Sequence, residues 1–185
     1  GIHEYFRRLS GDRFVNQMRE TLLQRLLSEF EQNSRPDWPW FEEVLSYANA
    51  KLPHALILGG RWGGGHPRAL EVGLKSLSWL VQQQRAEAGH FRPIGSNGFH
   101  RRGEQRAQFD QQPIEAYTTV AACIEAWYAT GDDTWMGEAR RAFEWFLGCN
   151  DLGQPLYDAT TGGCFDALHI DRVNLNQGAE STLSF

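Results

Sequence analysis

Two segments of the chain carry the same arrangement of side chains suited to a polar ligand. Both contain Gln-x-x-Glu, with Gln112 and Glu115 in the first segment and Gln177 and Glu180 in the second. Each pattern stands where a helix is expected to begin. The free N–H groups of a helix start, joined by amide and carboxylate side chains, make a polar surface. A glutamate at the third helical position also caps a helix, so capping is the competing interpretation of both patterns.

Carboxylates are the residues that glycoside chemistry requires, because one acts as an acid and another as a base or nucleophile about 5–10 Å away. We predict Glu115 and Glu180 as this catalytic pair. A cap or a surface charge is the alternative for each carboxylate taken alone. The carboxylates at expected helix starts and in neighbouring loops are Asp37, Glu42, Asp110, Glu115, Asp166 and Glu180.

A saccharide site also needs hydrogen-bonding groups and an aromatic surface on which a sugar ring can stack. Trp38 and Trp40 are the candidates for this surface, and burial in the core is the alternative for both. His100 stands beside two arginines and is predicted to contact an anionic group, with a solvated loop as the alternative. The other predicted saccharide contacts are Asp110, Gln111, Gln112, Asp166, Asn176 and Gln177.

Metal and cofactor chemistry is not expected from these residues. His169 lies near Asp166 and Asp171, but Asp-x-x-His-x-Asp is not a specific metal-binding pattern. The glycine-rich segment Gly59–Gly65 lacks the lysine and the serine or threonine of a phosphate-binding loop, so we interpret it as a turn. The three cysteines form no C-x-x-C pair, which favours reduced thiols and a cytoplasmic protein.

Apolar periodicity predicts a mostly helical chain. Apolar side chains recur at three- and four-residue steps over a first helix from about Asp12 to Glu31. A short link at Gly131 joins two later helices into an antiparallel hairpin, and one small β-hairpin is expected around residues 157–165. The remaining helices are expected over about Pro39–Ala50, Pro67–Glu87, Pro113–Thr130, Thr134–Cys149 and from Gly178 onward.

Composition and charge narrow the class of protein. Of the 185 residues, 41% are hydrophobic and 22% are charged, which is enough apolar material for a single folded domain. The net charge of −5 argues against nucleic-acid binding, and no segment approaches the ~20 apolar residues that cross a bilayer. The chain begins without Met and ends inside an expected helix, so we expect residues 1–185 to be one domain of a longer protein.

The recurrence of the Gln-x-x-Glu segments indicates a helical repeat. The chain resembles the six-hairpin (α/α)6 toroid enzymes of carbohydrate metabolism, which include glycoside hydrolases and N-acylglucosamine 2-epimerase. The resemblance is carried by residues 37–42 (DWPWFE), 109–116 (FDQQPIEA) and 162–183. The last segment is most similar to helical domains that follow bacterial sugar-nucleotide glycosyltransferases, often mannosyltransferase-like. Because the chain is too short for a full toroid, the resemblance implies an all-α fold of repeated helical hairpins in a partial or open ring.

The resemblance implies a carbohydrate-active domain associated with a bacterial glycosyltransferase. Such a domain would bind a saccharide in a polar cleft at the inner-helix starts and, if it is catalytic, process that saccharide without a cofactor. The implied partners are the saccharide and either a second copy of the chain or a fused glycosyltransferase domain. Two alternatives stay open. One is a non-catalytic helical scaffold or oligomerisation module, and the other is an amino-sugar epimerase with His100 or His169 as general base.

Overall fold

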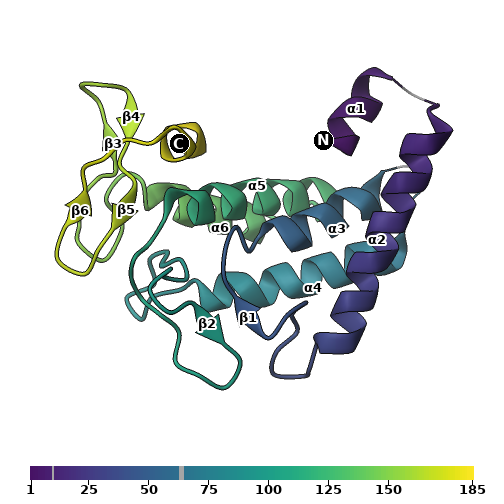
Figure 1. The fold of residues 1–185 in the computed structure, drawn as a ribbon, viewed down its shortest axis with the longest axis horizontal. Helices are drawn as coiled ribbons and strands as arrows, with labels where there is room; N and C mark the ends of the chain where they lie inside the picture. The colour runs from purple at the N-terminus through teal and green to yellow at the C-terminus, as the bar shows by residue number, and fades with distance from the viewer. Residues whose placement is uncertain (10, 63–64) are drawn as a thin grey trace.

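The computed structural model describes residues 1–9, 11–62 and 65–185, and over these ranges the chain is mostly helical (Figure 1). This confirms the predicted helical class. Across the described ranges, no helix combines the length and the apolar character that crossing a membrane requires. The helices are α1 (Ile2–Arg8), α2 (Arg13–Asn33), α3 (Lys51–Arg61), α4 (Pro67–Gln83), α5 (Pro113–Thr130), α6 (Thr134–Glu144) and α7 (Ala179–Ser184).

Several helix boundaries follow directly from local sequence signals. The Asp12 carboxylate accepts a hydrogen bond from Val15 N at 3.0 Å and so caps α2 at the residue where the sequence predicted its start. Helix α5 begins with Pro113 and ends at Gly131, whose φ of +69° lies in the left-handed region that glycine favours. Helix α6 is shorter than predicted, because residues 145–148 form a turn after Glu144.

The helix predicted over Pro39–Ala50 is wrong. Residues 39–50 form bends and turns around strand β1 (Val44–Leu45), which pairs antiparallel with β2 (His100–Arg101). Trp40 and Phe41 are both buried at adjacent positions of this segment, so they fill the core from an extended chain and do not line one face of a helix. The helix begins later, and Pro53 stands in the first turn of α3, where its missing N–H costs no hydrogen bond.

The turn predicted over Gly59–Gly65 is also wrong at its start. Gly59 and Gly60 lie in the last turn of α3 and are buried. A Cβ atom on Gly60 would come within 2.6 Å of the Leu70 backbone nitrogen in α4, so only glycine allows the two helices to approach this closely. Gly63 and Gly64 belong to the same predicted turn but lie outside the described residues.

The helices form two antiparallel hairpins, α3 with α4 and α5 with α6, and α3 lies against α5 (Figure 1). Asn49 precedes α3 and binds Glu115 at the start of α5, whereas Arg61 at the end of α3 pairs with Glu125 further along α5. Helices α3 and α5 therefore run parallel. Helix α7 contacts the α5 helix, so alternate helices of the chain lie next to one another.

Trp38 and Trp40 are core residues, with 4% and 0% of their surfaces exposed. Both pack against Trp79 of α4, at ring-centroid distances of 4.8 and 5.7 Å. The Trp38 indole N–H donates to the Glu42 carbonyl at 2.7 Å, so its polar atom is also satisfied inside the protein. The prediction that these tryptophans stack on a sugar is wrong, because neither ring reaches solvent. The alternative of core burial is confirmed.

The strands are short and form three two-stranded antiparallel sheets within the described part of the chain. Strands β3 (Tyr157–Asp158) and β4 (Gly163–Cys164) make the predicted β-hairpin. The sheets β1–β2 and β5 (Ala167–Leu168)–β6 (Val173–Asn174) were not predicted, because a two-residue strand leaves no alternation of apolar and polar residues to recognise.

Candidate functional site

The starts of α3, α5 and α7 meet at the turn formed by residues 47–49. Glu115 is the third residue of α5. Its carboxylate oxygen Oε2 accepts hydrogen bonds from Asn49 Nδ2 at 3.0 Å and from Asn49 N at 3.4 Å. From the other side of the same turn, the Tyr47 hydroxyl donates to Glu180 Oε2 at the start of α7. The two glutamates of the repeated motif are therefore joined through one turn of the chain.

Glu115 is enclosed by the protein, with 1% of its surface exposed. Its second oxygen, Oε1, has no hydrogen-bond partner among the described residues. Burial raises the pKa of Glu115 to about 7, although the hydrogen bonds from Asn49 and Ala48 act in the opposite direction. The carboxyl group therefore exchanges its proton near neutral pH, but it does not contact solvent in this conformation.

The 47–49 turn is held in a conformation that side chains with a Cβ atom rarely adopt. Ala48 has a φ of +48°, in the left-handed region. The Asn49 N–H donates to Glu115 Oε2 at 3.4 Å, and Ser46 N donates to Asn49 Oδ1 at 2.9 Å. With the bond from Asn49 Nδ2, these contacts attach the turn to Glu115. Glu115 therefore positions the exposed Tyr47 side chain.

Four exposed aromatic side chains lie along α3 and α5, and we call them the aromatic face. Tyr117 and Tyr128 are eleven residues apart on α5. Eleven residues make about three helical turns, so both rings lie on one side of the helix, roughly 16 Å apart along its axis. Tyr47 precedes α3 and Trp62 follows it. The exposed fractions are 53% for Tyr47, 38% for Tyr117, 59% for Tyr128 and 46% for Trp62.

Basic side chains lie over three of these aromatic rings. Lys51 Nζ lies 4.7 Å from the centroid of the Tyr117 ring. The Arg61 guanidinium lies 5.7 Å from the Trp62 ring and 5.6 Å from the Tyr128 ring, and it also pairs with Glu125. Cation–π contacts of this kind hold a basic side chain over a ring. The aromatic face therefore carries charged hydrogen-bonding groups between its rings.

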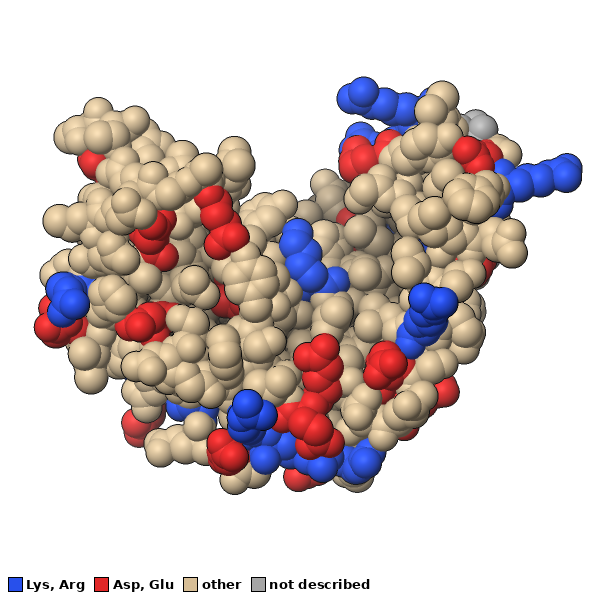
Figure 2. Space-filling model, viewed as in Figure 1, with Lys and Arg blue, Asp and Glu red and all other residues tan. Residues whose placement is uncertain are grey.

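The aromatic face spans the hollow of the molecule. At one end Tyr47 contacts α7, and at the other end Trp62 packs edge-on against His3 of α1, with ring centroids 4.7 Å apart. Figure 2 shows the surface hollowed between the end that carries α7 and the end that carries α1, above α3 and α5. A ligand in this hollow would meet the rings and the charged groups of both helices.

Gln111 is a core residue and not a ligand contact. Its side-chain N–H groups donate to Asp151 Oδ2 at 2.6 Å and to the Gln108 carbonyl at 2.9 Å, and its oxygen accepts from Trp145 Nε1 at 2.7 Å. None of its surface is exposed. This corrects the prediction for Gln111, because its amide is satisfied entirely inside the protein.

Asp166, Asn176 and Gln177 make local contacts at the start of α7. Asp166 accepts hydrogen bonds from Gly178 N at 2.7 Å and from the Asn176 amide. Burial would raise the pKa of Asp166, but the hydrogen bonds that it accepts outweigh burial and lower that pKa. Gln177 donates to Asp158 in the β3–β4 hairpin at 2.9 Å. These contacts attach α7 to the hairpin, and a role in saccharide binding stays a prediction for all three residues.

The remaining predicted residues are separate from the aromatic face. Asp110 pairs with His169, and Gln112 is the N-terminal cap residue of α5 without a side-chain capping bond. His100 packs edge-on against a core tryptophan, and its pKa is lowered first by burial and then by the charge of Arg106. His100 is half-buried, and its contact with an anionic group stays a prediction. Within the described ranges, no three His, Cys, Asp or Glu side chains are grouped as metal ligands.

The aromatic face contains residues that the sequence analysis missed. A signal was available in α5, where the eleven-residue spacing of Tyr117 and Tyr128 indicates one helix side. The exposure of that side was not visible, because α5 carries apolar residues around most of its surface. Tyr47 was assigned to the helix predicted over Pro39–Ala50, whereas it lies in the turn before α3, and Lys51, the first residue of α3, was not identified as a candidate.

Comparisons with known proteins assign no family to this arrangement. The sequence matches no protein-family model and no curated protein.

Proposed function

We propose that the chain is a saccharide-binding domain of the α/α toroid type, in which α3–α4 and α5–α6 are successive repeats. Helices α3, α5 and α7 would be the inner helices of a partial ring, and α4 and α6 the outer ones. The saccharide would lie along the aromatic face. Association with a bacterial glycosyltransferase is part of this proposal and rests on the sequence resemblance alone.

The observation that supports this proposal is the set of four exposed aromatic side chains, two on α5 and one at each end of the parallel helix α3. Sugar rings have apolar C–H faces that pack on aromatic rings, and hydroxyl groups that need polar partners. Lys51, Arg61 and Glu180 lie between or beside the rings and can supply those partners. The separation of Tyr117 and Tyr128, roughly 16 Å along the helix, suits an oligosaccharide better than a single sugar.

A reaction at this face would use the carboxylates at the starts of α5 and α7. Glu180 is exposed and can contact a ligand directly. Glu115 has a pKa of about 7, which suits an acid at neutral pH, but the 47–49 turn covers it. Glu115 would therefore reach a substrate only if this turn moved. The assignment of Glu115 and Glu180 as a catalytic pair stays a prediction, and saccharide binding is the function that we propose.

A second candidate function is a helical scaffold that docks another copy of the chain. Phe14, Met18 and Leu22 are exposed at four-residue steps on α2, so they form one apolar stripe. Such a stripe favours contact with a protein surface. Light scattering on a purified sample would test this candidate, since a Met18→Glu variant should convert a dimer into a monomer. A monomeric mass for the unaltered chain would remove it.

The histidines do not favour an epimerase. His100 is half-buried and packs edge-on against Trp38, and His169 pairs with Asp110. Neither histidine contributes a contact to the aromatic face, as far as the described residues show.

A glycan array probed with the whole chain tests the proposed function, followed by calorimetry with the oligosaccharide that binds most tightly. Tyr117→Ala and Tyr128→Ala should each weaken binding about tenfold, because each removes a stacked ring worth about 1–2 kcal/mol. Phe14→Ala is the matched control, since Phe14 is an exposed aromatic residue of α2 outside the aromatic face.

Two results would contradict saccharide binding at the aromatic face. Either no glycan on the array binds, or a glycan binds the two tyrosine variants as tightly as it binds the control. Turnover is measured separately, as release of reducing ends from the same oligosaccharide. If Glu180 is catalytic, Glu180→Gln should abolish release while calorimetry still detects binding.

A further inference from the structure

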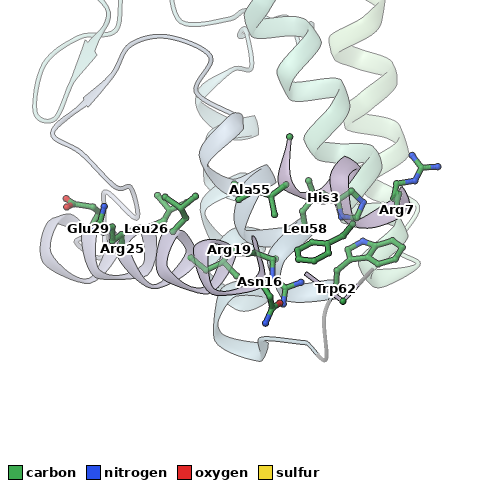
Figure 3. Close-up of a pocket in the computed structure, with 17 residues that line it drawn as sticks. His3, Arg7, Asn16, Arg19, Arg25, Leu26, Glu29, Ala55, Leu58 and Trp62 are labelled. Carbon is green, nitrogen blue, oxygen red and sulfur yellow. The ribbon is translucent and has the colours of Figure 1, made fainter. Parts of the chain in front are cut away.

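A cavity of about 710 Å³ lies between α1, α2 and α3, beside Trp62 at one end of the aromatic face (Figure 3). This volume falls in the range of roughly 300–1,000 Å³ that small-molecule sites occupy. The space is an open hollow and not an interior void, because Leu22 and Ala55, which line it, are exposed. Its apolar walls are formed by Ile2, Phe6, Leu22, Leu23, Leu26 and Leu58.

Helix α1 covers this cavity without filling it. None of the α1 residues is buried, although Phe6 lines the cavity. Two contacts place α1 over the space. His3 packs edge-on against Trp62 at 4.7 Å, and the Arg19 guanidinium lies 5.5 Å from the centroid of the Phe6 ring. The cavity is therefore bounded by three helices and open to a molecule that enters between them.

The polar side chains around the cavity are mostly basic. Arg7, Arg19 and Arg25 line it, against one acidic residue, Glu29. Two of these arginines, Arg7 and Arg19, form ion pairs. Arg19 is the more enclosed of the two, with 14% of its side chain exposed. Its partner is Glu20, the neighbouring residue, at 2.8 Å. An anionic ligand group could replace this exposed carboxylate at Arg19 while the rest of the ligand occupied the apolar space.

We propose that this cavity binds a monomeric amphiphile that has a linear alkyl chain and an anionic head group. The alkyl chain lies among the apolar side chains of α1, α2 and α3, and the head group binds Arg19. The volume, the apolar walls and the basic side chains support this assignment together. It does not depend on saccharide binding at the aromatic face.

Calorimetry with dodecanoate below its micelle concentration tests the site directly, with octanoate and dodecan-1-ol as comparison ligands. Affinity should rise roughly fourfold for each methylene that enters the cavity. Dodecanoate should bind about fivefold more tightly than dodecan-1-ol, because only the carboxylate pairs with Arg19. Equal affinities for octanoate and dodecanoate would overturn the proposal, and so would binding to phosphatidylglycerol vesicles without binding of dodecanoate.

Two variants locate the ligand. Ala55 lines the cavity from an exposed position on α3, so Ala55→Trp should fill the space and weaken dodecanoate binding at least tenfold. Ser78→Trp, on the exposed side of α4, is the control for adding a tryptophan to a helix. Arg19→Gln should lower the affinity for dodecanoate to that for dodecan-1-ol, whereas Arg140→Gln on α6 should not.

These comparisons hold even if one variant folds poorly. Circular dichroism checks the helical content of each variant before titration. If Ala55→Trp loses its helices, the Arg19→Gln comparison with two ligands still decides the site. Unchanged binding of dodecanoate in a folded Ala55→Trp or Arg19→Gln variant would overturn the proposal.

Discussion

Replacement of Glu115 by glutamine should remove a specific dependence of stability on pH. Glu115 has a pKa raised from 4.5 to about 7 by burial, so the folded chain binds a proton there that the unfolded chain releases between these two pH values. The free energy of unfolding therefore carries no penalty from Glu115 below pH 4.5. It falls as the pH rises from about 4.5 to about 7, because over this range the unfolded chain releases the Glu115 proton while the folded chain keeps it.

The size of this effect follows from the difference between the two pKa values. Each unit is worth 1.36 kcal/mol, so Glu115 should cost the folded state about 3 kcal/mol at pH 8 compared with pH 4. Glutamine has the same shape and no charge, and its side chain can still bind Asn49. We compare the free energy of unfolding of Glu115→Gln with that of the unaltered chain at each pH. Between pH 4 and pH 8, this difference should shift by about 3 kcal/mol in favour of the variant.

Urea denaturation followed by circular dichroism at several pH values between 4 and 8 measures this difference. Other groups that titrate over the same range include His54 and His100, whose pKa values are lowered by burial. Their effect is present in both proteins and cancels when the two profiles are subtracted. Glu71→Gln, on the exposed surface of α4, is the control for removal of a carboxylate that lies in solvent. Parallel profiles for Glu115→Gln and the unaltered chain would refute the reasoning.

Three further substitutions test the fold by the same denaturation assay. Gly60→Ala should destabilise the chain by about 1–3 kcal/mol, because its Cβ atom would meet the backbone of Leu70; an unchanged midpoint would contradict the close approach of α3 and α4. Gln111→Leu should cost about 1–3 kcal/mol by leaving the Trp145 indole N–H without a partner, and a smaller loss would mean that water satisfies it. Gly131→Ala should cost about 1 kcal/mol through its left-handed φ of +69°, and no loss would mean that α5 ends differently.

The candidate site was predictable only in part, and the reason lies in the separation of its residues along the chain. The repeated Gln-x-x-Glu pattern identified the starts of α5 and α7, and Glu115 and Glu180 both contact the 47–49 turn. The turn itself was predicted as helix. A contact between residues 66 positions apart depends on how α3 packs against α5, which local periodicity does not report.

The sequence by itself determined the helical class, the ends of α5 at Pro113 and Gly131, and the cap of α2 at Asp12. These features depend on residues within a few positions of one another, where proline, glycine and capping carboxylates act directly on the backbone. Only the tertiary structure decided which aromatic residues are exposed. Trp38 and Trp40 are buried and the tyrosines of α5 are not, because burial depends on the neighbouring helices that pack over a residue.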